Sequence, residues 1–259
     1  MIVARTVDDV RAALADRRGG TVALVPTMGA LHGGHRALVR AARGACDTVV
    51  LSLFLNPSQF GDPADLNGYP RDEAADLDAA GAAGVDLVFA PTTDEMYPPG
   101  YQTWVEVTEL GRMLEGEFRP GHFRGVATVC LKLFTIVRPD VVVFGQKDAQ
   151  QVAVLRRLIA DLHLELELLA VPTVRDPDGL ALSSRNARLT PAERRRALAL
   201  PRALATRDPD EARALLEEAG LDVDYVAIPP FHPPTIAAAV RAGSTRLIDN
   251  IPLETEVSR

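Results

Sequence analysis

Cysteine is scarce in this 259-residue chain, and long apolar runs are missing. The two cysteines, Cys46 and Cys130, lie far apart and have no Cys or His at metal-ligand spacing beside them. Each stands among apolar residues, so we expect two buried thiols rather than a metal site. No stretch reaches the roughly 18 consecutive apolar residues of a membrane-spanning helix. The composition therefore predicts a globular protein without a membrane span.

An excess of basic residues is also missing. The chain has 28 Lys and Arg against 35 Asp and Glu, a net charge of -7. Nucleic-acid binding needs a concentrated basic face, and the densest cluster, Arg194 to Arg196, is typical of the solvated side of a helix. The first residues carry acidic side chains and lack the basic and apolar regions of a secretory signal. We expect a cytoplasmic protein that does not bind nucleic acid.

Short apolar segments alternate with helical patterns through the first 170 residues. Strands apolar on both faces and separated by helices predict a parallel sheet covered on both sides. The fold class is thus α/β, a Rossmann-like doubly wound parallel sheet. The predicted strands are 21–27, 48–55, 85–91, 140–145 and 164–172, and the predicted helices between them are 36–45, 72–83, 125–139 and 149–163.

The pattern changes near residue 174. Thr190 and Glu193 form a capping-box signature with Pro191 at the first helical position, so a helical segment begins there. Two or three strands are expected in the tail. We therefore predict two domains, a Rossmann-like domain at 1–173 and a smaller C-terminal α+β domain at 174–259.

The segment PTMGALHGGH, residues 26–35, leads from the first of these strands into a helix. Its glycines allow close approach to a phosphate, but His35-Arg36 replaces the Lys-Ser/Thr ending of a P-loop, and the segment is not a Gly-x-Gly-x-x-Gly fingerprint. His32 and His35, three residues apart, lie on one side of a helical turn. Zinc is the competing interpretation, but the other histidines have no partners at ligand spacing. Phosphate contact is the favoured interpretation.

Five ordered blocks carry a family resemblance. The chain resembles the pantothenate synthetase (pantoate–β-alanine ligase) family of the HIGH-type nucleotidylyltransferase superfamily. The match runs from about residue 20 to 190, with DYV and TRLIDN similar near the C-terminus. The blocks are PTMGALHGGH, FLNPSQFGDPADLNGYPRD (54–72), FRPGHFRGVATVCLKLFTIVRPD, FGQKDAQQ (144–151) and VRDPDGLALSSRN (174–186).

The resemblance implies a reaction and a set of residues. Members condense (R)-pantoate with β-alanine using ATP, through a pantoyl adenylate, and release AMP and diphosphate. Such chemistry needs orientation and charge stabilisation rather than a protein nucleophile. The implied catalytic residues are His32, His35, Lys147, Ser183, Ser184 and Arg185. These six also belong to the implied ATP site, with Pro26, Thr27, Met28, Gly29, Gly34, Gly145, Gln146, Asp148, Val174 and Leu182.

The resemblance also extends to the other substrates and to assembly. Met28, Gln59 and Gln151 match pantoate-binding positions, and Gln59 is also implied for β-alanine. Mg²⁺ should accompany ATP, held by phosphates and water with Asp148 as the candidate carboxylate. A homodimer and a lid-like C-terminal domain are expected from the family.

Several positions depart from the family pattern or were assigned no role. Gly33, Gln146 and Leu182 stand where relatives often carry a charged residue, glutamate and methionine. Leu for Met conserves apolar volume, whereas Gln146 lacks a charge beside Lys147. Asp76 and Asp78 are expected on the solvent face of their helix.

Two other functions are weighed against the ligase. A nucleotidylyltransferase would leave its product adenylylated, and a non-catalytic protein would bind ATP without turnover. Omission of the amine distinguishes the first, because a ligase then shows pantoate-dependent exchange of diphosphate into ATP but accumulates no free adenylylated product.

Overall fold

The computed structural model describes residues 1–17, 19–61, 66–69 and 71–253. By internal contacts it divides into two compact units. The first comprises Met1–Phe144 and Val154–Val171, and the second comprises Gly145–Ala153 and the chain from Pro172 onward. The block at 54–72 includes residues 62–65 and 70, which lie outside the described part.

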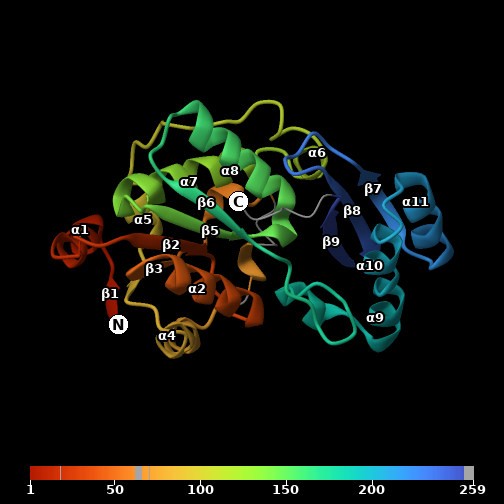
Figure 1. Cartoon of the computed structure of the whole chain (residues 1–259), viewed down its shortest axis with the longest axis horizontal. Helices are drawn as coiled ribbons and strands as arrows, with labels where there is room; N and C mark the ends of the chain where they lie inside the picture. The colour runs from red at the N-terminus through yellow and green to blue at the C-terminus, as the bar shows by residue number, and fades with distance from the viewer. Residues whose placement is uncertain (18, 62–65, 70, 254–259) are drawn as a thin grey trace. The chain divides into compact units, whose positions relative to one another are not determined.

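The first unit is built on a six-stranded sheet in the order β1-β4-β3-β2-β5-β6. Neighbouring strands from β1 through β5 pair in parallel. Helices α2 and α4 cover one face, and α7 and α8 cover the other (Figure 1). The predicted doubly wound fold is confirmed. The strands are β1 (Ile2–Ala4), β2 (Val22–Thr27), β3 (Thr48–Leu53), β4 (Leu87–Phe89), β5 (Val141–Gly145) and β6 (Glu167–Val171).

The main helices start and end close to the predicted positions. The Thr6 side chain caps α1 by accepting the N–H of Asp9. These helices are α1 (Val7–Ala15), α2 (Gly33–Ala45), α4 (Glu73–Ala82), α7 (His122–Val137) and α8 (Ala149–Asp161). Shorter turns are η1 (Pro57–Gln59), α5 (Thr93–Met96), α6 (Glu115–Phe118) and η2 (Gln146–Asp148).

The core of the first unit explains the strand composition. Val25, Leu51 and Val143 are fully buried against α2 and its neighbours. Consecutive residues of β2 and β3, such as Leu24 and Val50 beside them, are also fully buried, so both faces of these strands are covered. Such two-sided burial requires apolar residues on both faces of each strand. Cys46 and Cys130 are free and buried, as predicted. No helix within the described residues is long and apolar enough to cross a membrane.

The second unit has an antiparallel sheet in the order β7-β8-β9. The capping box at Thr190 and Glu193 is present, with Pro191 at the first helical position. Arg195 and Arg196 are exposed as expected, but Arg194 pairs with Asp176 and Asp178 at 2.6 and 2.8 Å. The elements are η3 (Ser184–Arg188), α9 (Pro191–Ala197), α10 (Ala199–Leu204), α11 (Pro209–Glu218), β7 (Asp222–Ala227), β8 (Thr235–Ala242) and β9 (Thr245–Pro252).

Candidate active site

The strand order of the first sheet reverses at β2. From β2 the chain adds β3 and β4 on one side, and it later adds β5 and β6 on the other. Ligands of such sheets bind outside the carboxyl ends of the strands where the order reverses. β2 ends at Thr27, directly before the segment in which the sequence predicts phosphate contacts.

A buried carboxylate fixes the turn after β2. Gly29 has a φ of +88° and Ala30 a φ of +52°. The Asp76 carboxylate on α4 accepts the N–H groups of Ala30 at 2.9 Å and Leu31 at 2.7 Å. Asp76 is only 6% exposed, so its expected place on a solvent face is wrong, whereas Asp78 is exposed as expected. Helical periodicity could not reveal this role, because the N–H donors lie 45 and 46 residues away in sequence.

His32 and His35 cap the helix that they begin. The N–H of Gly34 donates to Nδ1 of His32 at 3.1 Å, and the N–H of His32 donates to Nδ1 of His35 at 3.2 Å. The ring centroids are 4.2 Å apart. An imidazole nitrogen that accepts a hydrogen bond carries no proton, so each neutral ring carries its proton on Nε2. Both rings are therefore set as Nε2–H donors.

The start of α2 suits an anion. Its first turn has no acidic residue. Unpaired backbone N–H groups and the helix dipole attract negative charge at such a terminus. Two imidazole donors at this terminus give a combination that suits phosphate oxygens.

Gln59 and Met28 meet in the same unit, as their shared predicted role requires. Gln59 is 7% exposed, and its Nε2 donates to Sδ of Met28 at 3.1 Å. Asn56 donates from Nδ2 to Oε1 of Gln59 at 3.0 Å, and its Oδ1 accepts from the hydroxyl of Tyr97 at 2.9 Å. Asn56 thus orients Gln59, a role the sequence analysis missed. The sequence signal for this role is that Asn56 directly precedes Pro57, where an Asn typically caps the start of a helical turn.

Helix α7 forms a close wall behind Gln59. A Cβ on Gly125 would lie 2.4 Å from the carbonyl oxygen of Ser58, so only glycine allows this approach. Nδ1 of His122 lies 2.9 Å from the Gln59 carbonyl oxygen, which can only accept, and Nε2 lies 3.2 Å from Nη1 of Arg119, which can only donate. The backbone of Gln59 is therefore fixed as well as its side chain.

In the second unit, a hairpin loop gathers several predicted ATP residues. The N–H of Leu182 donates to the carbonyl of Val174 at 2.9 Å. Ser183 caps η3 by accepting the N–H of Arg185 at 3.2 Å. Arg175, beside Val174, makes two hydrogen bonds to the fully buried Asp249 carboxylate on β9, at 2.7 and 3.0 Å. This ion pair attaches the loop to the small sheet.

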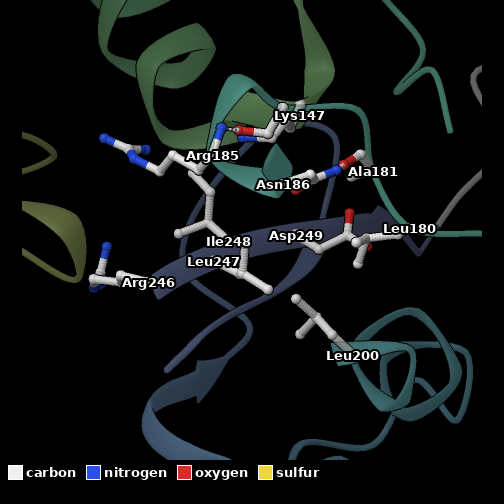
Figure 2. Close-up of a pocket in the computed structure, with 11 residues that line it drawn as sticks. Lys147, Leu180, Ala181, Arg185, Asn186, Leu200, Arg246, Leu247, Ile248 and Asp249 are labelled. Carbon is white, nitrogen blue, oxygen red and sulfur yellow. Dashed lines mark hydrogen bonds between the residues drawn. The ribbon is translucent and has the colours of Figure 1, made fainter. Parts of the chain in front are cut away.

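A small cavity lies within the second unit. Figure 2 shows Lys147, Arg185 and Asn186 near β9, which contributes Leu247, Ile248 and Asp249 to the lining. Ser183 also lines it, so three predicted catalytic residues meet there. The side-chain oxygen of Asn186 is buried and has no hydrogen-bond partner among the residues that the structure describes. The predicted residues Gly145, Gln146, Asp148, Gln151, Val174, Leu182 and Ser184 belong to the same unit but do not line the cavity.

Asp148 is the predicted metal ligand. Its half-exposed carboxylate lies 3.7 Å from Nζ of Lys147. Among the described residues no group of three or more His, Cys, Asp or Glu side chains is arranged to hold a metal ion. A lone carboxylate fits an ion held chiefly by phosphate oxygens and water, as Mg²⁺ is with nucleotides.

Fold and side chains together define a class. A doubly wound sheet, a glycine-framed histidine pair at the start of α2 and a cationic Ser-Ser-Arg loop are features of an α/β enzyme that acts on a nucleoside phosphate. The model of the pantoate-beta-alanine ligase family matches residues 2–252. The chain belongs to this family, whose members catalyse the ATP-dependent condensation of pantoate and β-alanine.

Individual relatives agree over nearly full length. The pantothenate synthetase of Nocardioides sp. (strain ATCC BAA-499 / JS614) is 52% identical over 93% of this chain and 81% of its own. The crystal structure of pantothenate synthetase from Thermus thermophilus matches with a TM-score of 0.90 and 44% identity over 98% and 100% of the two chains. The pantoate-beta-alanine ligase from Francisella tularensis, complexed with beta-gamma ATP and beta-alanine, matches with a TM-score of 0.87 and 34% identity over the whole of both chains.

Proposed function

We propose that the chain activates (R)-pantoate as an adenylate before amide formation. The pantoate carboxylate attacks the α-phosphorus of ATP, forms an acyl–phosphate bond and releases diphosphate. The β-alanine amine then attacks the acyl carbon, breaks that bond and releases AMP. The carrying observation is the match to the ligase family across residues 2–252, together with candidate phosphate donors in both units.

The histidine pair is proposed to act on the triphosphate. Nε2–H groups of His32 and His35 donate to phosphate oxygens as negative charge develops during attack. Gly34 and the first turn of α2 supply backbone donors. Pro26, Thr27, Met28 and Gly29 are proposed to contact the nucleotide because they form the preceding strand end and turn.

Gln59 is proposed to bind pantoate and then β-alanine. It is held on three sides, by Asn56, by Met28 and through its own carbonyl by His122. A fixed amide can hydrogen-bond a hydroxyl or carboxylate without first losing side-chain entropy. Met28 supplies an apolar surface for the gem-dimethyl group of pantoate, and Gln151 is proposed as a second pantoate amide.

The second unit is proposed to supply the cations. Lys147 gives a point charge, and Arg185 gives a planar fork for phosphate oxygens. Ser183 and Ser184 add hydroxyl donors. Gly145, Gln146, Val174 and Leu182 are assigned to the nucleotide, and Mg²⁺ is proposed to accompany ATP with Asp148 as its protein ligand.

A product assay tests this proposal. Protein incubated with pantoate, β-alanine and Mg-ATP should release AMP and diphosphate. Without β-alanine it should exchange labelled diphosphate into ATP only when pantoate is present, with no free adenylylated product accumulating. Formation of ADP, or turnover that does not require pantoate, would contradict the reaction.

The role of His35 is tested separately. We expect His35→Ala to lower kcat about 10²–10³-fold, as for loss of one transition-state donor. It also removes a helix cap, at about 1 kcal/mol, so urea unfolding is measured beside kcat. The exposed His163 provides the control variant His163→Asn, which should retain full turnover. Near-normal kcat in His35→Ala would refute the assignment.

Assembly, closure and location complete the proposal. A homodimer follows from the family resemblance and is checked by light scattering of the purified chain. Closure of the C-terminal domain over ATP should protect residues 174–190 from proteolysis when ATP is added. We assign the enzyme to the cytoplasm, which fractionation of the source cells tests.

A further inference from the structure

Asn250 of β9 bonds to the turn that carries Lys147, and both belong to the second unit. Only 3% of this residue is exposed. Its Nδ2 donates to the carbonyl oxygens of Gln146 at 2.8 Å and Lys147 at 2.9 Å. Its Oδ1 lies 3.4 Å from Nε2 of Gln146. One carboxamide thus contacts two consecutive residues of η2.

The chemistry of these contacts is specific to an amide. Two neighbouring carbonyl oxygens need two hydrogens from nearly one point, and a carboxamide nitrogen carries two. An aspartate of the same shape would place its oxygen against both carbonyls and donate to neither at neutral pH. A serine hydroxyl has only one hydrogen to donate. Asn250 therefore does here what no isosteric residue can do.

Asn250 itself is held in place. The preceding residue, Asp249, is fully buried and receives two hydrogen bonds from Arg175. The N–H of Asn250 donates to Oδ1 of Asp249 at 2.8 Å. Position 250 pairs with Ala237 of β8 in the sheet. The Asn250 carboxamide is thus held by a strand of the sheet rather than by a loop.

The η2 turn that Asn250 holds carries Lys147, a proposed catalytic cation. Lys147 lines the cavity that Ser183 and Arg185 also line, and its side chain is 18% exposed. A lysine side chain is flexible, so its reach depends on where its backbone is held. Loss of the Asn250 hydrogen bonds would let the η2 backbone shift. A displacement of a catalytic group by about 1 Å can lower the reaction rate on the order of a hundredfold.

We propose that Asn250 is a positioning residue that fixes the backbone of Lys147, and so places the lysine ammonium for contact with ATP phosphates. The inference rests on the proposed function of Lys147. It assigns Asn250 no contact with substrate. The Nε2 of Gln146 is the donor to the side-chain oxygen of Asn250. A glutamate at position 146 would offer only an acceptor there.

A double-mutant cycle tests the proposal. When one residue acts through another, the effects of substituting the two on binding free energy do not add. The four proteins are wild type, Asn250→Ala, Lys147→Ala and the double variant. We expect Asn250→Ala to weaken binding of a nonhydrolysable ATP analogue, measured by calorimetry, about tenfold, because the displaced Lys147 ammonium loses a charge-assisted hydrogen bond to phosphate. In the Lys147→Ala background the same change should alter that affinity less than about twofold.

A matched control on the same strand is Ile251→Val, which trims packing against the core of the second unit. It should lower the urea midpoint yet leave analogue affinity unchanged in both backgrounds. Asn250→Asp should weaken binding at least as much as Asn250→Ala. If the Asn250→Ala loss is the same with and without Lys147, or no larger than that of Ile251→Val, the proposal is overturned.

Analogue binding separates this proposal from the proposed reaction. Absence of pantoate-dependent AMP release from the wild-type protein refutes the ligase assignment and leaves the cycle interpretable. An additive cycle in a protein that makes AMP refutes only the role of Asn250.

Discussion

Substitution of Gly29 by alanine probes the turn that leads to the histidine pair. The new Cβ would lie 2.7 Å from Oδ2 of Asp76 and 3.1 Å from Cδ1 of Leu53, at a residue whose φ is +88°. The carboxylate cannot move away without losing the hydrogen bonds that its Oδ2 accepts from the N–H of Ala30 and its Oδ1 accepts from the N–H of Leu31. The change therefore combines backbone strain with a steric clash against a group that is held in place.

Gly84 isolates the strain. It has a φ of +87°, but a Cβ there would meet no atom within 4 Å. Gly84→Ala should cost about 1–2 kcal/mol from the left-handed backbone alone. Gly29→Ala should add about 1–3 kcal/mol for overpacking, for a total of about 2–5 kcal/mol. Only the difference between the two variants reports the contact with Asp76.

Two assays measure the pair. Urea unfolding gives the free energies, and AMP release in the complete reaction gives kcat. Because Gly29 lies three residues before His32, Gly29→Ala should lower kcat by up to about a hundredfold, as small displacements of donors do, whereas Gly84→Ala should keep it. Equal destabilisation by the two substitutions, with equal turnover, would refute the account of the turn.

Three further substitutions test other contacts. Asp76→Asn should cost about 2–4 kcal/mol in urea unfolding, since the two N–H groups bind different carboxylate oxygens and an amide would set its NH2 group against one of them; a loss below about 0.5 kcal/mol would contradict this. Arg175→Met should cost about 3–5 kcal/mol, because it leaves the buried Asp249 charge unpaired, and unchanged stability would count against the ion pair. Burial raises the pKa of Tyr97 to about 12 from 10.0. A raised folded pKa gives stability that is complete below about pH 10 and is lost as pH rises towards about 12, so Tyr97→Phe should flatten the fall of the melting temperature in that range, and an unaltered profile would refute it.

Local signals predicted the local features well. The Thr190 capping box formed as the spacing indicated, because all its atoms lie within four residues. The strands with two buried faces were recognised by continuous apolar runs, and the helix predicted over 36–45 forms as α2, which begins three residues earlier at Gly33. These features depend on neighbours in sequence and need no knowledge of distant packing.

Long-range features were missed for a physical reason. Strand β8 has the sequence TIAAAVRA, in which alanine by itself favours a helix. The segment forms a strand because it pairs with β7 on one side and β9 on the other. β1 has three residues and exists by pairing with β4, more than eighty positions later. Asp76 and Asn250 read as ordinary polar residues because their partners lie 46 and 104 positions away.

The reciprocal capping of His32 and His35 has a further consequence. The backbone amides at the start of α2 occupy one nitrogen of each ring as soon as the helix forms. Proton placement on the opposite nitrogens is thus decided during folding, and nucleotide arrival demands no tautomer exchange. The chain enters each turnover with its electrophilic contacts already oriented, so the reorganisation that water would require has been completed before substrate binds.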